Sequence, residues 1–474
     1  MGGLGIMGTM EMARNSMRVA RSGAEVSGNN LANASNPIYA RQRIKIDSSV
    51  TIPTEKGPQG SGAAVARLEQ IRDKVLDAAV IYENSITGYH EGRLGYLQQA
   101  ENALGQTVDN HTIDAGGAYG TYGLSEGMTE LFNSFQSLSV SPTSISERQT
   151  VISNAKKISS KLNTVYERLD RLRAAINEEV KDTIAQVNGK IKEVAYIAIN
   201  IGNIEVVDGS ANEVRDSLQF AMEQLSKYAE IKTTYNENGE LSLEVNNHEM
   251  ITDNVMTNGI TAKQDTVTGM YYMVDTAEGK TVNANTGHIK GLIDVRDQSV
   301  KNLREDIDAM ASQLITEVNA LHQTGYDLDG VNDNSRGFFD GTGAANIKVN
   351  ETIADNPRKL QGSSSAGETS NNDILRSIAD LGSKAIAGLN SVSFSEYYSN
   401  TLSRFGHEVS LTTSQLNDQK TVEQLLLKQR ESIMGVSIDE EVANLVVYQR
   451  AFQASAKLLT TMDGLMQDVL NMTR

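Results

Sequence analysis

Residues 27–46 read SGNNLANASNPIYARQRIKI and mark the end of a predicted N-terminal helix. Upstream, small and apolar residues recur at alternating steps of four and three, which keeps one stripe of a helix facing a partner helix. This seam consists of Ile6, Met10, Ala13, Met17, Ala20, Ala24, Ser27 and Leu31. The segment from Asn33 to Pro37 then breaks the pattern, because asparagine, serine and proline favour turns.

The seam residues are small, so each buries little apolar area. At about 25 cal/mol per Å² the isolated helix gains too little to offset its ordering entropy. Its methionines suit packing against non-identical neighbours, although ordinary packing explains them equally well. We therefore expect a helix that is only marginally stable until it packs against partner helices. We also expect the residues after it, Tyr39, Arg41, Gln42 and Arg43, to contact acidic residues of neighbouring copies.

The C-terminal helix carries more apolar surface than a monomer needs. Gly435 ends a long helical stretch, and Ser437 and Glu440 have the spacing of a capping box, so a new helix begins at about Ile438. One seam of this helix contains Val442, Leu445, Phe452, Ala456, Leu459, Met466 and Leu470, and a second contains Ala451, Ala454, Leu458, Met462, Leu465 and Val469. Because a surface helix needs one apolar face, two faces favour contact with both its own chain and another subunit over burial in a large core.

Long helices are also predicted in the middle of the chain. Residues 63–105 indicate a short strand running into a helix, and Gly116 to Gly123 indicate a loop. Ser144 and Glu147 form a second capping-box pair, and the apolar stripe that follows continues to about Ile199. At 1.5 Å per residue this helix is on the order of 80 Å long, which describes a rod.

A β insertion interrupts the helical pattern. Near Ile231 alternating apolar residues flank an Asn238-Gly239 turn, a strong hairpin signal, and short alternating pieces continue towards Gly291. Helix resumes with Val300 and ends before Gly325. The last long helix runs from about Ser395 to Met434.

Composition narrows the class of protein. A chain of 474 residues with 60 acidic and 43 basic residues has more than one domain, and its net charge of −17 disfavours nucleic acid as a partner. The absence of cysteine excludes disulfides, thiol catalysis and zinc-thiolate sites. No run approaches the roughly 18 apolar residues of a membrane span, and the first residues do not resemble a secretory signal. If the protein is exported, we expect another route.

No motif in the sequence predicts a catalytic, cofactor-binding or metal-binding site. Gly3, Gly5 and Gly8 spell G-x-G-x-x-G, but no strand precedes them. Residues 327–339, DLDGVNDNSRGFF, are rich in calcium-binding residue types, yet Phe338 stands where a bidentate glutamate is needed, so we expect a loop held by Asx turns. The six histidines lack metal-binding spacing. The sequence does not exclude a catalytic site assembled from residues that are distant in the chain.

Both ends of the chain resemble flagellar axial proteins. Residues 27–42 are similar to the N-terminal signature shared by rod, hook and hook-associated subunits, and residues 435–470 to the matching C-terminal signature. In the middle, ALHQTGYDLDG at 320–330, followed by GFF, resembles the hook-associated proteins of the first type, the family at the hook-filament junction. The similarity covers nearly the whole chain and weakens in the β insertion. Pro37-Ile38 departs from the family's usual Pro-Gly, whereas Asn212, Arg215 and Asp216 of a family helix are kept.

The resemblance implies a structural adaptor that joins hook to filament and is not an enzyme. It implies export through the flagellar type III pathway, termini that fold on assembly, and a homo-oligomeric helical ring or tube. The implied partners are hook protein, another hook-associated protein on the filament side and an export chaperone, with no cofactor, nucleic acid or membrane. The alternatives are another axial protein, such as hook protein or flagellin, or a secreted enzyme with its site in the β insertion.

We therefore predict a mainly α fold with an inserted β domain: an elongated rod whose terminal helices pair as a coiled-coil-like inner layer. Its domains are a terminal assembly domain (1–58 with 437–474), a rod (59–229 with 292–436) and an outer β domain (230–291). The predicted assembly residues are Met10, Ala13, Met17, Ala20, Ala24, Asn29, Asn30, Leu31, Asn33, Tyr39, Arg41, Gln42, Glu441, Asn444, Leu445, Tyr448, Gln449, Phe452, Ala456, Leu459 and Met466.

Overall fold

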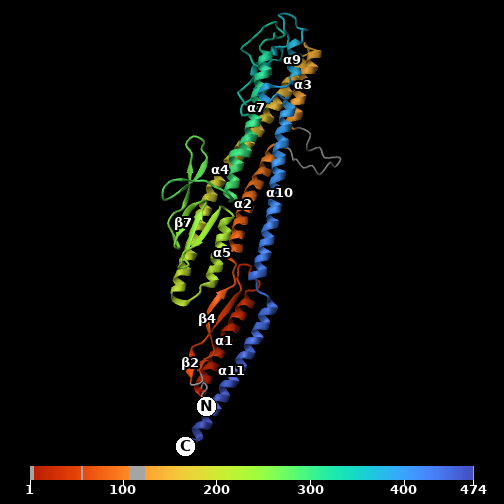
Figure 1. The fold of residues 1–474 in the computed structure, drawn as a ribbon. Helices are drawn as coiled ribbons and strands as arrows, with labels where there is room; N and C mark the ends of the chain where they lie inside the picture. Colours follow the sequence, from red (N-terminus) through yellow and green to blue (C-terminus); the bar gives the residue numbers. More distant parts are fainter. Residues whose placement is uncertain (1–4, 55–56, 106–122, 473–474) are drawn as a thin grey trace.

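The computed structural model describes residues 5–54, 57–105 and 123–472 and shows an elongated, mainly helical molecule with both chain ends at one pole (Figure 1). The molecule has three parts. A terminal unit (residues 5–54, 57–72 and 436–472) lies at one end of a long rod, and a β insertion lies against the side of the rod. This arrangement confirms the predicted fold class. The loop predicted at Gly116 to Gly123 lies outside the described residues, except for Gly123 itself.

The terminal unit pairs the first and last helices of the chain. Helix α1 (Ile6–Ala32) lies beside α11 (Ile438–Met472). The chain leaves α1 through a short turn and enters two antiparallel ribbons, β1 (Gln42–Ser48) with β4 (Ala63–Gln70), and β2 (Thr51–Thr54) with β3 (Gly57–Gly60). The ribbon β1–β4 packs on α1. Strand β4 was predicted, whereas β1 was missed, because its polar and basic residues suggested a binding segment.

In the part of the chain that the structure describes, six long helices build the rod. They are α2 (Lys74–Ala103), α3 (Leu124–Val140), α4 (Ile145–Asp208), α5 (Asn212–Ser226), α7 (Val300–His322) and α10 (Phe394–Met434). The predicted cap of α4 is confirmed, since the Ser144 hydroxyl accepts a hydrogen bond from the Glu147 N–H at 3.3 Å. Helix α4 continues past the predicted end at Ile199, and its 64 residues span about 95 Å.

The core of the rod is continuous. The predicted apolar stripe of α4 is buried along its length, and the fully buried members include Ile158, Leu162, Leu169, Ile176, Val180, Ile191 and Val194. Towards the distal pole, Phe135 of α3 meets Phe338 edge-on, with ring centroids 5.3 Å apart. Short elements complete that pole: β12 (Phe339–Asp340), β13 (Lys348–Val349), α8 (Glu351–Asp355), η2 (Pro357–Lys359), α9 (Asp373–Asp380) and η3 (Ala387–Leu389).

The β insertion contains two small antiparallel sheets against α4. The first has the order β5 (Ile231–Tyr235), β6 (Leu241–Val245), β7 (His248–Thr252), β8 (Val255–Met256), and the second β11 (Thr281–Val282), β10 (Tyr271–Asp275), β9 (Ile260–Gln264). The predicted hairpin is confirmed, with Gly239 at φ 82° in its loop. The predicted helix from Val300 is confirmed as α7, but helical structure resumes before it, in α6 (Gly287–Asp294) and a π-helical turn, η1 (Val295–Ser299).

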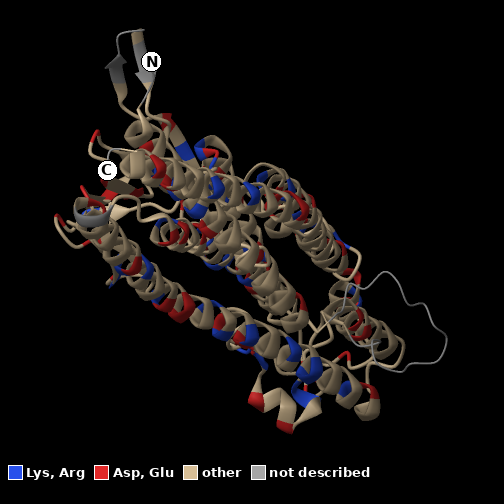
Figure 2. Ribbon diagram, turned by 90° about the horizontal axis from the view of Figure 1, so that it is seen from below, with Lys and Arg blue, Asp and Glu red and all other residues tan. Residues whose placement is uncertain are grey.

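Charged residues of both signs are spread along the helices, as the blue and red segments of the ribbon in Figure 2 show. No helix in the described ranges is long and apolar enough to cross a membrane.

Candidate functional site

The pairing of α1 with α11 depends on small residues. The buried residues of α1 are Ala13, Ala20, Gly23, Ser27 and Asn30. At Gly23 an added Cβ atom would lie only 2.4 Å from the Tyr448 ring of α11, so the two helices approach at a distance that a larger residue would prevent. The contact is close, but each of these residues buries little apolar area.

The predicted seam of α1 is only partly the buried face. Met10, Met17 and Ala24 are half-buried, and Leu31 is 37% exposed. Gly23 and Asn30 are buried in place of Ala24 and Leu31, because the Tyr448 ring covers Gly23 and the Asn30 side chain bonds to Tyr39 and Gln42.

Helix α11 is covered on one face only. Glu441 is buried, and the predicted residues Asn444, Leu445, Tyr448, Ala456, Leu459 and Met466 are half-buried, whereas Gln449 and Phe452 are exposed. Other apolar side chains of the helix face solvent, including Val447, which is 62% exposed. The single chain therefore leaves apolar residues of both predicted seams exposed, among them Phe452 of the first seam and Leu465 of the second.

A buried hydrogen-bond network fixes the turn after α1. The Asn30 side-chain oxygen accepts hydrogen bonds from the Tyr39 hydroxyl at 2.8 Å and from the Gln42 N–H at 3.0 Å, and the Asn30 amide donates to the Gln42 carbonyl at 2.8 Å. Burial, together with the charge of Asp216, raises the pKa of Tyr39 to about 12, so its hydroxyl stays a donor. Asn33 donates to the Asn29 carbonyl at 3.0 Å and ends the helix.

Arg41 joins this turn to the start of α11. Its Nε lies 2.7 Å from a Glu441 oxygen, its Nη1 lies 2.7 Å from a Glu440 oxygen, and its backbone N–H donates to the Met434 carbonyl at 3.0 Å. Burial lowers the pKa of Arg41, but the hydrogen bonds to Glu440 and the charge of Glu441 outweigh it and raise the pKa overall. The acidic partners of Arg41 thus lie in its own chain rather than in a neighbour, and Tyr39 and Gln42 are likewise bonded within the chain.

Sequence reasoning missed Asp216 as the residue that connects the terminal unit to the rod. This carboxylate of α5 is 3% exposed and accepts from the Ala40 N–H at 3.2 Å, the Gln70 amide at 2.9 Å and the Arg72 guanidinium at 2.6 Å. Burial raises the pKa of Asp216, while Arg72 and the other donors oppose that shift. The retained family residues around Asp216 were the signal that could have identified it.

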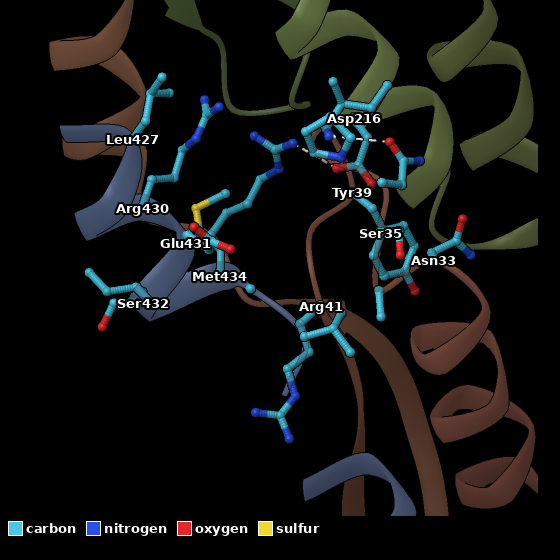
Figure 3. Close-up of a pocket in the computed structure, with 18 of the residues that line it drawn as sticks. Asn33, Ser35, Tyr39, Arg41, Asp216, Leu427, Arg430, Glu431, Ser432 and Met434 are labelled. Atoms are coloured by element: carbon cyan, nitrogen blue, oxygen red, sulfur yellow. Dashed lines mark hydrogen bonds and ion pairs between the residues drawn. The ribbon is translucent and has the colours of Figure 1, made fainter. Parts of the chain in front are cut away.

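A cleft of about 680 Å³ lies beside Asp216, between the turn after α1, helix α5 and the end of α10 (Figure 3). Most of its charged residues are paired: Arg430 with Glu223, Arg72 with Asp216, and Arg41 with Glu440. Among the residues that the structure describes, no group of three or more His, Asp or Glu side chains is placed to hold a metal ion. The cleft is a joint between the two parts of the molecule.

In the loop at 327–339, which is rich in calcium-binding residue types, the negative charges are neutralised by the chain itself. Asp327 Oδ1 accepts from the backbone N–H groups of Asp329 at 2.9 Å and Val331 at 3.0 Å, which confirms the predicted Asx turns. The Lys359 ammonium lies 3.2 Å from Asp327 Oδ2 and 2.9 Å from Asp329 Oδ2. A lysine of the chain thus contributes the positive charge that a bound cation would otherwise supply.

Comparison with known proteins identifies two segments. Residues 111–339 match the family described as the flagellar hook-associated protein FlgK helical domain. Residues 429–472, which include α11, match the family described as the flagellar basal body rod FlgEFG protein C-terminal.

Whole-chain relatives agree with these matches. Flagellar hook-associated protein 1 of Bacillus subtilis is 26% identical, over 98% of this chain and 97% of the relative, and that of Salmonella typhimurium is 22% identical, over 97% and 98%. A solved structure of the flagellar hook junction protein FlgK from Burkholderia pseudomallei aligns with 56% of this chain and 46% of its own, at 18% identity and a TM-score of 0.47. The chain is therefore similar to flagellar hook-associated protein 1 over almost its whole length, and its middle and C-terminal segments match families of flagellar proteins.

Proposed function

We propose that this chain joins hook to filament and that it assembles into a helical ring or tube through α1 and α11. The observation that carries the proposal is the uncovered apolar face of α11, in a helix pair whose own seam is made of small residues. Such a pair buries too little surface alone, and its free apolar face is suited to another subunit.

The two faces of the pair differ, so a contact between copies is head-to-tail. A head-to-tail contact generates a ring where its rotation closes and a helical tube where it does not. We propose hook protein and another hook-associated protein as the neighbours on the two sides, and export in an unfolded state through the flagellar pathway with a chaperone. The relatives' names support a place on the flagellum.

We propose no catalytic role. The two features most similar to ligand sites are the cleft beside Asp216 and the loop at Asp327, and in each of them carboxylates are paired with arginine or lysine side chains of the same chain.

The test is removal of α11. A chain that ends at Ser437 should keep the helical content of the rod but fail to join the flagellum, as seen by electron microscopy with an antibody against the rod. The matched full-length chain should be found in a short zone between hook and filament. Normal incorporation of the shortened chain, or label along the whole filament, would overturn the proposal.

A further inference from the structure

The lower half of α10 exposes one stripe of side chains that its own chain leaves uncovered. The stripe follows steps of three and four residues and contains Leu411, Gln415, Asp418, Val422, Leu425, Gln429 and Ile433. Leu425 is 61% exposed at its centre. A helix that is packed on one side does not need apolar residues on the other, so this stripe indicates a second contact.

Helix α4 exposes a similar stripe near its C-terminal end. It contains Ala185, Gly189, Lys192, Tyr196, Ile199, Asn203 and Val206, again at steps of three and four. Tyr196 is 68% exposed and Val206 is 87% exposed. An added Cβ atom at Gly189 would meet nothing within 4 Å, so the surface there is open.

The two stripes lie on helices at different sides of the rod. In Figure 1, α10 lies on one side of α2, and α5 and the lower end of α4 lie on the other; α2 packs against α10 and also contacts α5 and α4. Both α4 and α10 run from the distal pole towards the terminal unit. Neighbouring copies placed side by side would therefore bring α10 of one against α4 of the next with their chains parallel.

The two stripes also match residue by residue. In one register Asp418 faces Lys192, Val422 faces Tyr196, and Leu425 faces Ile199, because the steps between these residues are the same on both helices. The same register places the two amides Gln429 and Asn203 together, and it sets the long side chains of Leu411 and Gln415 against the small residues Ala185 and Gly189. Apolar residues meet apolar ones, and opposite charges meet.

The charged pair supports this register. Within the part of the chain that the structure describes, neither Asp418 nor Lys192 forms an ion pair. We propose that α10 of one copy packs in parallel on α4 of the next copy in this register. The inference rests on the proposed function and adds a rod-to-rod contact to the one made by the terminal helices. Because the two surfaces differ, the contact is head-to-tail and propagates from copy to copy.

Thiol cross-linking tests the register directly, since the chain has no cysteine of its own. The variant with Ile199→Cys and Leu425→Cys should replace the natural chain in cells, and isolated flagella should be treated with a short bifunctional thiol reagent. We expect a ladder of dimers and larger multimers on a denaturing gel. The matched control, Ile199→Cys with Gln424→Cys, turns one thiol away from the stripe at the same height of the helix and should give at least tenfold less multimer.

The register would be overturned if the double variant gave no ladder or if the control gave an equal ladder. It would also be overturned if the Leu425→Cys single variant cross-linked to itself or to another flagellar protein. Charge reversal is a second measurement. Asp418→Lys and Lys192→Asp should each reduce the incorporated chain about tenfold, because like charges then face each other, and the double variant should restore it. Failure of the double variant to restore incorporation would contradict the pairing.

The two proposals fail separately. If the chain lacking α11 stays out of flagella while the full-length double-cysteine chain gives no ladder, only the contact between α10 and α4 is wrong. If the chain lacking α11 is incorporated normally, the proposed function itself is wrong.

Discussion

The rod and the terminal unit are both built from long helices, but they bury different kinds of residues. In the rod, α4 presents a stripe of fully buried leucine, isoleucine and valine side chains along much of its length. In the terminal unit, the buried residues of α1 are alanine, glycine, serine and asparagine, and apolar residues of α11 face solvent. The rod therefore has a core of its own, whereas under the proposed function the terminal unit completes its core with residues of other subunits.

The largest expected effect lies in the rod. Phe135→Ala removes a fully buried ring that packs on Phe338, and we expect it to lower the free energy of unfolding of the rod by about 3–5 kcal/mol, measured by urea denaturation. The comparison variant Phe452→Ala changes a partly exposed ring of α11 and should change that free energy by less than about 0.5 kcal/mol. Equal losses would remove the distinction between the two parts.

A pH effect on stability is also expected in the rod. His322 is fully buried, and burial lowers its pKa from 6.5 to about 4. Its ring accepts the Gln361 N–H at 3.0 Å and lies 3.1 Å from the Arg336 carbonyl, which suits the neutral form. Because the unfolded chain binds the proton more readily, this stability is present above pH 6.5 and is lost as the pH falls to 4, by about 3 kcal/mol.

The measurement is a series of urea denaturation curves of the rod between pH 7 and pH 4. His322→Gln, which cannot take up the proton, should flatten the dependence. An unchanged slope in the His322→Gln variant would show that other groups cause it.

Within the terminal unit, Arg41 should matter most. Arg41→Met leaves the buried Glu441 carboxylate without its guanidinium partner, so we expect α11 to be destabilised by about 2 kcal/mol, measured as faster hydrogen exchange in the peptides that contain residues 438–448. The control Arg21→Met removes an exposed pair with Glu25 and should change that exchange little. Equal hydrogen exchange of residues 438–448 in the two variants would contradict this role of Arg41.

The smallest effect is expected at Gly23. A Cβ atom there overlaps the Tyr448 ring, so Gly23→Ala should separate α1 from α11 at a cost of about 1 kcal/mol, visible as faster exchange in both helices. Gly28→Ala is the matched control, because nothing lies within 4 Å of its added Cβ atom and alanine favours a helix. Similar exchange in the two variants would show that close approach at Gly23 is unimportant.

The helices of this protein were predictable because their signals are local. The caps Ser144 and Ser437, the hairpin near Asn238 and the apolar stripe of α4 each depend on residues close together in the chain, and the structure confirms them. Helix α6 was missed because its glycines, including Gly287, suggest a turn, yet its glycine at 291 lies against the backbone of Tyr89, where an added Cβ atom would lie 2.4 Å from the carbonyl oxygen.

The contacts between the terminal unit and the rod were harder to predict from the sequence. Arg41 meets Glu441 across almost the whole chain, and Asp216 meets Ala40 and Arg72 across most of its first half. Sequence spacing carries no information about such distant partners, so the basic cluster was correctly matched to acidic residues of the same protein but wrongly assigned to other copies of it.

Hydrogen exchange of the full-length chain, free and assembled, tests the difference between the two regions most directly. In the free chain we expect the amides of α1 and α11 to exchange at least about 100-fold faster than those of the middle of α4, because the terminal unit opens locally at low cost. In flagella, the amides of α1 and α11 should become as protected as those of α4. Equal protection of both regions in the free chain, or no gain of protection in α1 and α11 on assembly, would contradict the account.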